Sequence, residues 1–302
     1  MKERLVRTDL KNISSIDFHD NHLLFSGKNI RSCRGKWDQL KVYYGVSYFL
    51  RSMISLSDEK VLVEDGKCVY HILDLNAGTV LFSQKMRRDV SGTSRFAISD
   101  DGRTAFRVWL RGKKHEIAVI DLSDLSYRIF PYPASLNGVA DLVYIKDSGL
   151  LAMETQVNAD KTCQNQVVSV QFCDEKCILK PLHTWFGERT AKYFDGRYVW
   201  ESGYKVRDLY TDGIIDLLEN SPIRFPEKHV PLAYTYYPEK KYLQIIDQKQ
   251  NSFVDCIEKK IIAQYSLDPE AESYRGVLVG NEFWIGKPDG IYAMPFPILE
   301  NK

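Results

Sequence analysis

Arginines recur at one position relative to glycine turns, and their guanidinium groups are the strongest candidates for chemistry in this sequence. Arg95 lies seven residues before Gly102 in "SDDG", and Arg189 lies seven residues before Gly196 in "FDG". A looser alignment of the rest of the chain brings three more charged residues to this place or within one residue of it: Arg51, Asp141 and Arg275. Guanidinium groups hold carboxylates and phosphates through paired hydrogen bonds.

If the fold brings these positions together, they form an electropositive ring that suits a carboxylate, a phosphate or an acidic segment of a partner. The alternative is that each arginine pairs with a carboxylate of its own repeat or is solvated. Both interpretations remain open at the level of the sequence.

Other residue types with chemical potential do not form a recognisable site. The chain has no P-loop, no HExxH, no GxSxG and no complete calcium loop. Cys173 and Cys177 in "CDEKC" resemble half of a zinc site, but no second Cys/His pair stands at ligand spacing, so a hairpin tip without metal is predicted. The six histidines are scattered, and none pairs in sequence with an obvious nucleophile. We therefore expect no metal and no cofactor, and a non-catalytic role is favoured over an enzymatic one.

Aromatic residues offer a second possible surface. The candidates either pack between sheets or form an exposed contact surface, for which tyrosine is well suited. They are Tyr43, Tyr44, Tyr48, Tyr234, Tyr236, Tyr237 and Trp284.

The elements that would position these residues are short strands. Residues 94–130, "SRFAISDDGRTAFRVWLRGKKHEIAVIDLSDLSYRIF", contain four apolar segments separated by polar turns, a pattern typical of a four-stranded antiparallel meander. The turns "SDDG" and "FDGR" are predicted to place their glycines at positive φ. Short helical turns are predicted at residues 214–220 and 268–273.

The meander recurs along the chain. An aspartate closes the third predicted strand at Asp74, Asp121, Asp208 and Asp255, with steps of 47, 87 and 47 residues. The double step spans one degenerate repeat. A period of about 40 to 45 residues with four strands each is typical of a β-propeller.

On these "hhDL" strand ends, and on the single Trp-Asp pair at Trp37 and Asp38, the chain resembles the WD-repeat, YVTN and quinoprotein-like propeller class. The Gly-His pair of true WD repeats is missing. The resemblance implies the architecture, in which innermost strands line a central channel and the loops that enter them surround its mouth.

The predicted fold is an all-β, seven-bladed propeller formed by residues 1–302 as a single domain. The first strands are expected near Ser14, Phe49, Ser94, Ala140, Glu188, Pro231 and Tyr274. The last repeat lacks a fourth strand, whereas residues 3–8, "ERLVRT", alternate without a repeat of their own. We expect this N-terminal strand to complete the last blade and close the ring.

Bulk composition restricts the classes of partner. Forty-one basic and 40 acidic residues give a net charge of +1, which does not favour a nucleic-acid or anionic-membrane surface. No apolar stretch is long enough to span a bilayer, and the N-terminus lacks a signal-peptide core. Six cysteines in 302 residues fit a reducing compartment, so a cytoplasmic location is expected.

The function expected from the sequence is a non-catalytic protein-binding platform, such as an adaptor, a scaffold or an inhibitor of a partner protein. Binding would use one face of the propeller or the channel mouth. The alternative is an enzyme or small-ligand receptor that takes an anionic ligand at the mouth. The candidate residues for either are Arg51, Arg95, Asp141, Arg189 and Arg275.

Overall fold

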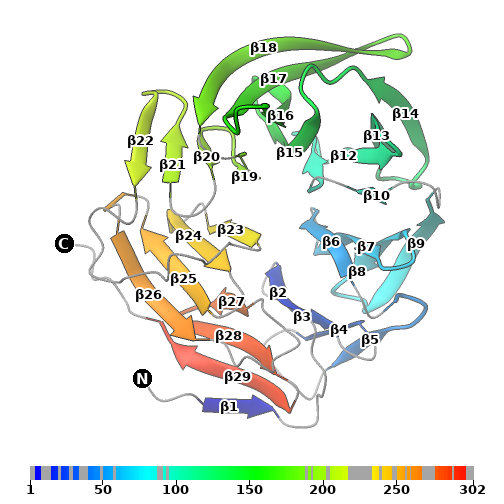
Figure 1. Ribbon diagram of the computed structural model, residues 1–302. Coiled ribbons are helices and arrows are strands. Elements are labelled where there is room, and N and C mark those ends of the chain that lie inside the picture. Colours follow the sequence, from blue (N-terminus) through cyan, green and yellow to red (C-terminus); the bar gives the residue numbers. More distant parts are fainter. Residues whose placement is uncertain are drawn as a thin grey trace. The chain divides into compact units, whose positions relative to one another are not determined.

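A computed structural model shows an all-β chain (Figure 1). It describes residues 4–7, 15–19, 22–26, 30–33, 40–47, 50–56, 59–86, 91–92, 95–187, 190–191, 193–201, 205–216, 233–237, 240–246, 250–255, 257–258, 260–266, 276–287 and 289–296. The strands within these ranges form seven antiparallel sheets that follow one another in sequence. Successive antiparallel sheets of four or, in one case, five strands are the blades of a β-propeller, which confirms the all-β propeller architecture of the prediction.

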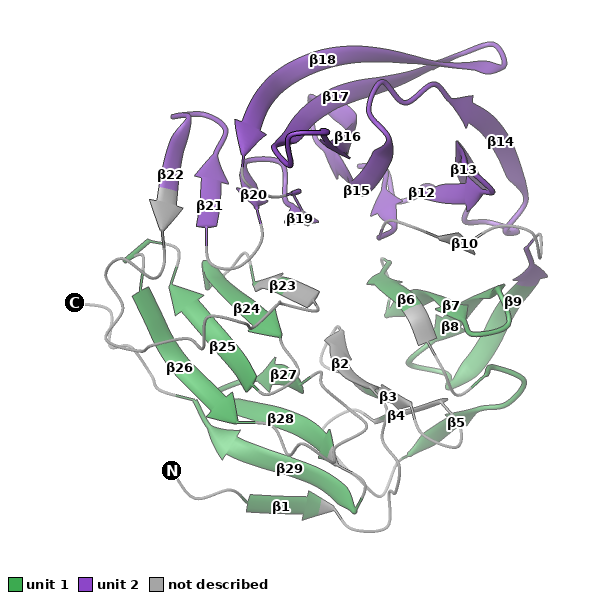
Figure 2. Ribbon diagram, in the orientation of Figure 1, with its two compact units in different colours: residues 1–83, 220–302 green, residues 84–219 purple. Residues whose placement is uncertain are grey.

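The chain divides into two compact units, residues 1–83 with 220–302, and residues 84–219 (Figure 2). The first unit contains four sheets. Two come from the N-terminal part: β2 (Ser15–His19), β3 (His22–Ser26), β4 (Ile30–Cys33) and β5 (Lys41–Tyr43), then β6 (Leu50–Ser55), β7 (Lys60–Asp65), β8 (Val69–Asp74) and β9 (Thr79–Lys85), whose last two residues fall in the second unit. Two come from the C-terminal part: β23 (Ala233–Tyr237), β24 (Tyr242–Ile246), β25 (Gln250–Asp255) and β26 (Lys260–Ser266), then β27 (Gly276–Val279), β28 (Glu282–Lys287) and β29 (Gly290–Pro295), together with β1 (Arg4–Arg7).

The second unit contains three sheets. They are β10 (Ser91–Gly92), β11 (Ala97–Ile98), β12 (Thr104–Arg111), β13 (Lys114–Asp121) and β14 (Tyr127–Tyr132); β15 (Gly138–Ile145), β16 (Gly149–Val157), β17 (Cys163–Cys173) and β18 (Lys176–Gly187); and β19 (Tyr193–Phe194), β20 (Tyr198–Trp200), β21 (Lys205–Asp208) and β22 (Gly213–Asp216). The predicted helical turn at residues 214–220 is wrong in its first part, because Ile214–Asp216 pairs with β21. The remainder of that turn, and residues 268–273, lie outside the described residues.

The recurring aspartates end the third strand of their sheets, as predicted. Asp74, Asp121, Asp208 and Asp255 are the last residues of β8, β13, β21 and β25. Each side chain accepts a backbone N–H from the turn that follows, from Ala77 at 2.7 Å, Ser123 at 2.8 Å, Tyr210 at 3.0 Å and Ile257 at 2.8 Å. The repeat in the sequence is therefore a repeat of one turn geometry, in which an Asx-type bond starts the return to the outer strand.

The predicted glycine turns also have the expected geometry. Gly102 has φ +68° and Gly196 has φ +106°, values that side-chain-bearing residues rarely adopt. The carboxylates of these turns bond locally, since Asp101 accepts from Arg103 N at 3.0 Å and Asp195 from Arg197 N at 2.9 Å. These are structural turns.

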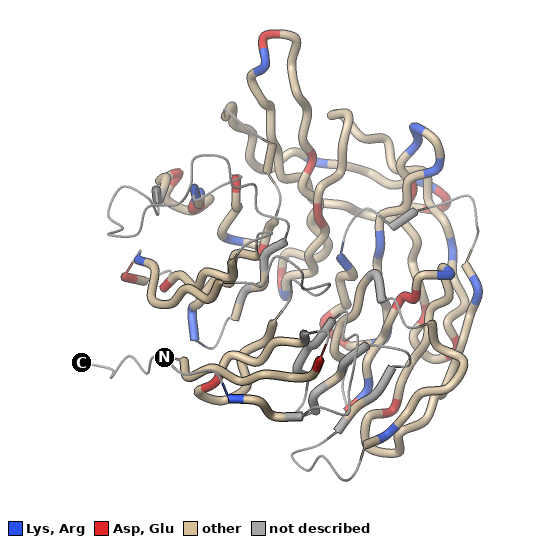
Figure 3. Tube along the Cα trace, turned by 60° about the horizontal axis from the view of Figure 1, so that its bottom comes forward, with Lys and Arg blue, Asp and Glu red and all other residues tan. Residues whose placement is uncertain are grey.

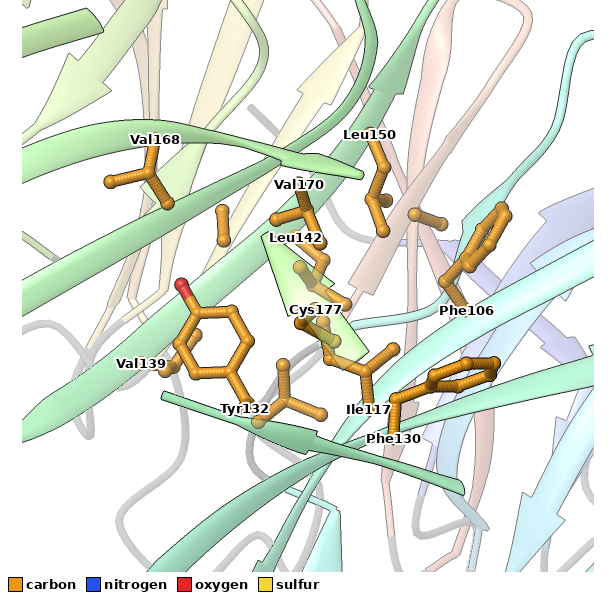
Figure 4. Close-up of a cluster of buried hydrophobic side chains, with 13 residues drawn as sticks. Phe106, Ile117, Phe130, Tyr132, Val139, Leu142, Leu150, Val168, Val170 and Cys177 are labelled. Carbon is orange, nitrogen blue, oxygen red and sulfur yellow. The ribbon is translucent and has the colours of Figure 1, made fainter. Parts of the chain in front are cut away.

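Apolar residues fill the space between successive sheets of each unit. In the second unit, one cluster joins the sheet of β12–β14 to that of β15–β18, with Phe106, Ile117 and Phe130 facing Leu142, Leu150 and Val168 (Figure 4). A second cluster joins β15–β18 to β19–β22. In the first unit, equivalent clusters join β2–β5 to β6–β9 and β23–β26 to β27–β29. Face-to-face packing of twisted sheets is the arrangement that a propeller requires.

The N-terminal strand lies beside the last strand of the chain. In β1, Arg4 pairs with Ala293 and Leu5 with Tyr292 of β29. The Arg4 guanidinium also donates to both carboxylate oxygens of Glu282, at 2.8 and 2.9 Å. The outer edge of β29 is thereby covered by a strand from the other end of the sequence.

Candidate functional site

Arg95 and Asp141, two of the predicted site residues, contact each other in the second unit. Arg95 lies two residues before β11, and Asp141 lies in β15, the first strand of the next sheet. Arg95 Nη2 donates to Asp141 Oδ2 at 2.8 Å, and Nε lies 3.2 Å from both carboxylate oxygens. The Arg95 side chain is 44% exposed, whereas that of Asp141 is 3% exposed. The pair thus joins a buried anion to a cation that reaches solvent.

The same carboxylate contacts a third sheet. Phe194 N, in β19, donates to Asp141 Oδ2 at 3.1 Å, and Arg95 Nη2 donates back to the Phe194 carbonyl at 2.8 Å. Leu142 N donates to the other carboxylate oxygen at 3.0 Å. Residues of three consecutive sheets, Arg95 before β11, Asp141 in β15 and Phe194 in β19, therefore meet at one buried carboxylate. Such a junction suits a carboxyl side chain, whose two oxygens can each accept more than one hydrogen bond.

An aromatic ring lies against the guanidinium. The centre of the Tyr193 ring is 3.8 Å from the Arg95 guanidinium carbon, a cation–π distance. Burial raises the pKa of Tyr193 above 10, although the nearby Arg95 opposes this shift. Burial likewise raises the pKa of the neighbouring Asp195 above its usual value. Arg95 therefore contacts buried groups on one side and solvent on the other.

This geometry bears on the predicted ring of arginines. At Arg95, the position that an external anion would take is occupied on one side by the protein's own Asp141. The pairing with a carboxylate agrees with the alternative raised from the sequence, except that the carboxylate comes from the neighbouring sheet and not from the same one. Arg189 and Arg275 lie outside the described residues, and Arg51 is described only as backbone within β6. The ring as a whole stays a prediction.

The cysteines of "CDEKC" do not converge. Cys173 pairs with Lys176, and Cys177 pairs with Phe172, across a two-residue turn. Cys173 therefore lies on the same face of the sheet as its partner Lys176. Because adjacent residues of a strand face opposite sides, Cys177 lies on the other face, and the two thiols point away from each other. Cys173 is exposed and Cys177 is buried. No cluster of three metal-ligating side chains is found in the part of the chain that the structure describes.

The aromatic candidates divide between the two roles. Tyr43 is buried and bonds to Ser32 Oγ at 2.7 Å, so it packs. Its neighbour Tyr44 is 78% exposed. Tyr237 and Trp284 are partly buried, whereas the side chains of three others are not described: Tyr48, Tyr234 and Tyr236.

One buried carboxylate was not singled out from the sequence. Glu154 of β16 is fully buried and accepts from Tyr132 Oη and Ser135 Oγ at 2.7 Å, from Gln166 Nε2 at 2.6 Å and from Leu136 N at 3.2 Å. Burial is the main cause of the raised pKa of Tyr132, and the nearby Glu154 carboxylate raises it further. This network links β14 and its following loop to the next sheet, and its donors saturate the carboxylate. It is a structural junction.

Charged residues of both signs are interspersed along the described trace (Figure 3). This distribution agrees with the balanced composition and shows no extended region of one sign. None of the described segments forms a helix of the length and apolar character that crossing a membrane requires.

Comparison with known proteins adds no family to this architecture. No family model matches the chain, and no curated protein is found as a relative. The propeller class therefore rests on the sheets themselves, and Trp37 and Asp38, which carried part of the resemblance, lie outside the described residues.

Proposed function

We propose that the chain forms one seven-bladed ring closed by β1 and acts as a platform that binds another protein. The seven consecutive sheets and the pairing of β1 with β29 support the ring. A relation to WD-repeat, YVTN or quinoprotein-like propellers is part of the proposal, supported by the shared arrangement of sheets. The unpaired cysteines Cys163 and Cys177, both buried, support a reducing, cytoplasmic location.

The observation that carries the binding function is the apolar character of one outer strand. β18 has 12 residues, and the other described outer strands have seven or fewer (Figure 1). It exposes Ile178 (51%), Leu182 (44%) and Phe186 (66%) to solvent. Three large apolar side chains exposed along a single strand are typical of a contact surface for a protein.

The chemistry of β18 indicates the kind of segment that it would bind. β18 is the last strand of its sheet, so one of its edges presents backbone N–H and C=O groups to which an extended peptide can pair. Lys176 and Lys180 flank Ile178 on one face of the strand. A partner segment with acidic, apolar and acidic residues at every second position would place all three on one face, where they match both the charges and the apolar side chain.

Two features of the strand limit where pairing occurs. Pro181 has no N–H to donate, and the register shifts between Val167 and Val168 opposite it, which interrupts the ladder. Backbone pairing of a partner segment along β18 is therefore confined to one side of Pro181. The interruption also restricts indiscriminate edge-to-edge association of the free protein.

Affinity capture from the native cell with the intact chain tests the proposal. We expect a stoichiometric partner protein that is retained by the wild type and lost by the double variant Ile178→Lys/Leu182→Lys. The matched control is Ile214→Lys/Ile257→Lys, which alters two other exposed apolar residues and should retain the partner. Absence of any stoichiometric partner contradicts the binding function. Equal retention by both double variants contradicts β18 as the surface.

A second candidate function, binding of an anion at the channel mouth, is favoured by the exposed side of the Arg95 guanidinium. It predicts that millimolar phosphate or citrate raises the melting temperature and that Arg95→Ala abolishes the increase. We expect no such increase, because Asp141 already neutralises Arg95. An anion effect lost in Arg95→Ala would favour the receptor over the platform.

A further inference from the structure

Ser83, His71 and Asp65 form a hydrogen-bonded line across three neighbouring strands of the first unit. His71 Nδ1 lies 2.7 Å from Ser83 Oγ, and His71 Nε2 lies 3.3 Å from Asp65 Oδ2. The residues come from β9, β8 and β7 respectively. His71 and Asp65 are buried, whereas Ser83 is exposed on the outer strand. A serine on the exposed outer strand is thus backed by an imidazole and a carboxylate.

The hydrogen bonds define the protonation of this line. Burial alone would raise the pKa of Asp65, but backbone N–H groups, chiefly those of Val69 and Ser47, together with His71 lower it. The ionised carboxylate accepts the proton on His71 Nε2, so that Nδ1 is left as an acceptor for the Ser83 hydroxyl. Burial lowers the pKa of His71, although Asp65 opposes this shift, so the imidazole is held in its neutral form, the form that accepts a proton.

We propose that Ser83 is a nucleophile, with His71 as its general base and Asp65 as the group that positions the imidazole, and that it takes acyl groups from esters. An exposed hydroxyl, a base within hydrogen-bond reach and a third group that orients the base are the elements of an activated serine. The two ring nitrogens are used in the reverse sense from serine proteases. The direction of proton transfer, from hydroxyl to imidazole, is the same.

The proposed reaction proceeds through an acyl ester on Ser83. Ser83 Oγ attacks the ester carbonyl carbon, its proton passes to His71 Nδ1, and the bond from the carbonyl carbon to the alkoxy oxygen breaks. The alcohol leaves with the proton from His71, and an acyl ester remains on Ser83. Water then attacks this ester, His71 takes a proton from the water, and the acid is released as Ser83 regains its hydrogen.

The surroundings of Ser83 indicate the class of ester. Leu81, two residues earlier on β9, faces the same side of the strand as Ser83 and is 40% exposed. An apolar acyl chain would lie against it. Because β9 is the last strand of its sheet, its outer edge presents backbone N–H groups, which are the donors that a developing oxyanion needs. We therefore expect esters with short apolar acyl groups.

A fluorophosphonate probe on the full chain tests this inference. Ser83 Oγ would attack phosphorus, fluoride would leave, and the hydroxyl proton would pass through His71 to water. We expect one adduct per chain, mapped to Ser83 by mass spectrometry, and none on Ser83→Ala. We also expect hydrolysis of p-nitrophenyl butyrate that is lost in Ser83→Ala. His71→Gln should slow labelling by about 10² or more.

Control variants separate a loss of labelling at Ser83 from a loss of the folded state. Because Ser83→Ala removes the hydroxyl partner of the buried His71 Nδ1, its folding is checked by circular dichroism, and labelling is compared on folded protein only. Ser266, at the end of the outer strand β26, is a matched exposed serine, and Ser266→Ala should label like the wild type. Absence of an adduct on the wild type overturns the inference. So does labelling of a folded His71→Gln at the wild-type rate, since the line of bonds would then be structural. Neither result bears on the partner-binding function.

Discussion

Arg95 and Asp141 are 46 residues apart in sequence and form a two-point contact between two sheets, with Nη2 2.8 Å from Oδ2. The carboxylate is buried, and it is also bonded by Phe194 N from a third sheet. The contact therefore does more than pair two charges. It joins the segment before β11 to β15 and β19, which belong to three successive sheets.

Removal of the Arg95 side chain should destabilise the fold. Arg95→Ala leaves the Asp141 carboxylate buried with only backbone donors, and we expect the free energy of unfolding in urea to fall by about 1–3 kcal/mol, a range reduced for the exposure of Arg95. Arg95→Lys should recover only part of the loss, because an ammonium cannot reproduce the two-point contact.

Arg128→Ala is the matched control for this measurement. Arg128 is exposed on β14, where its guanidinium carbon lies 5.6 Å from the centre of the Phe130 ring. Its removal should change the free energy of unfolding by no more than about 0.5 kcal/mol. Equal effects of Arg95→Ala and Arg128→Ala would show that the junction contributes nothing to stability.

The two cysteines of the β17–β18 hairpin should differ in reactivity. Burial raises the pKa of Cys177 to about 12, so at about pH 8 it is almost entirely a thiol and is also inaccessible. Cys173 is exposed at the hairpin tip. Iodoacetamide should therefore alkylate Cys173 in the native protein and spare Cys177 until denaturant is added, as read by peptide mapping. Native alkylation of Cys177 at the rate of Cys173 would contradict the register of this hairpin.

Acid should weaken the fold in two steps through His71 and Asp65. Burial lowers the pKa of His71 below 6.5, so below that pH the unfolded chain binds a proton that the folded chain resists, and stability falls. The pKa of Asp65 is lowered below 3.8, so its contribution is present above that value and is lost as the pH falls through the folded pKa. Each proton contributes a slope of at most about 1.4 kcal/mol per pH unit.

His71→Gln isolates the first of these steps. In urea titrations between about pH 7 and pH 5, the variant should lose stability less steeply than the wild type. His115 also has a pKa lowered by burial, so His115→Gln serves as the comparison and its effect should add to that of His71→Gln. An unchanged slope in His71→Gln would show that His71 is not resisting protonation in the folded state.

The strand order was predictable because the sequence repeats local chemistry. Each recurring aspartate bonds within its own turn, and each turn glycine has a backbone conformation of its own, so both signals lie within a few residues. Hydrophobic alternation supplied the strands between them. These features do not depend on what lies next to the sheet.

Which side chains meet at each site was not predictable from the sequence in the same way. The line from Ser83 through His71 to Asp65 depends on which residues oppose each other across three strands, and the Asp141 junction on which sheets are neighbours. One signal was present: His71 stands between buried apolar residues in "VYHILD", where an imidazole needs hydrogen-bond partners. The sequence does not say which partners these are, because hairpin register and sheet packing decide it.

Deletion of residues 1–8 tests the proposed closure of the ring. Without β1, the backbone groups of β29 that pair with Arg4 and Leu5 are exposed, and β29 becomes an open sheet edge. We expect a lower melting temperature by several degrees and a tendency to aggregate, measured by calorimetry and light scattering. The control is Arg4→Ala, which keeps the strand but removes the ion pair to Glu282. Because the Arg4 side chain is 57% exposed, this variant should cost less than about 1 kcal/mol. If the deletion variant melts like the wild type, β1 does not close the structure. If the deletion lowers the melting temperature no more than Arg4→Ala does, the stabilisation comes from the ion pair and not from the strand.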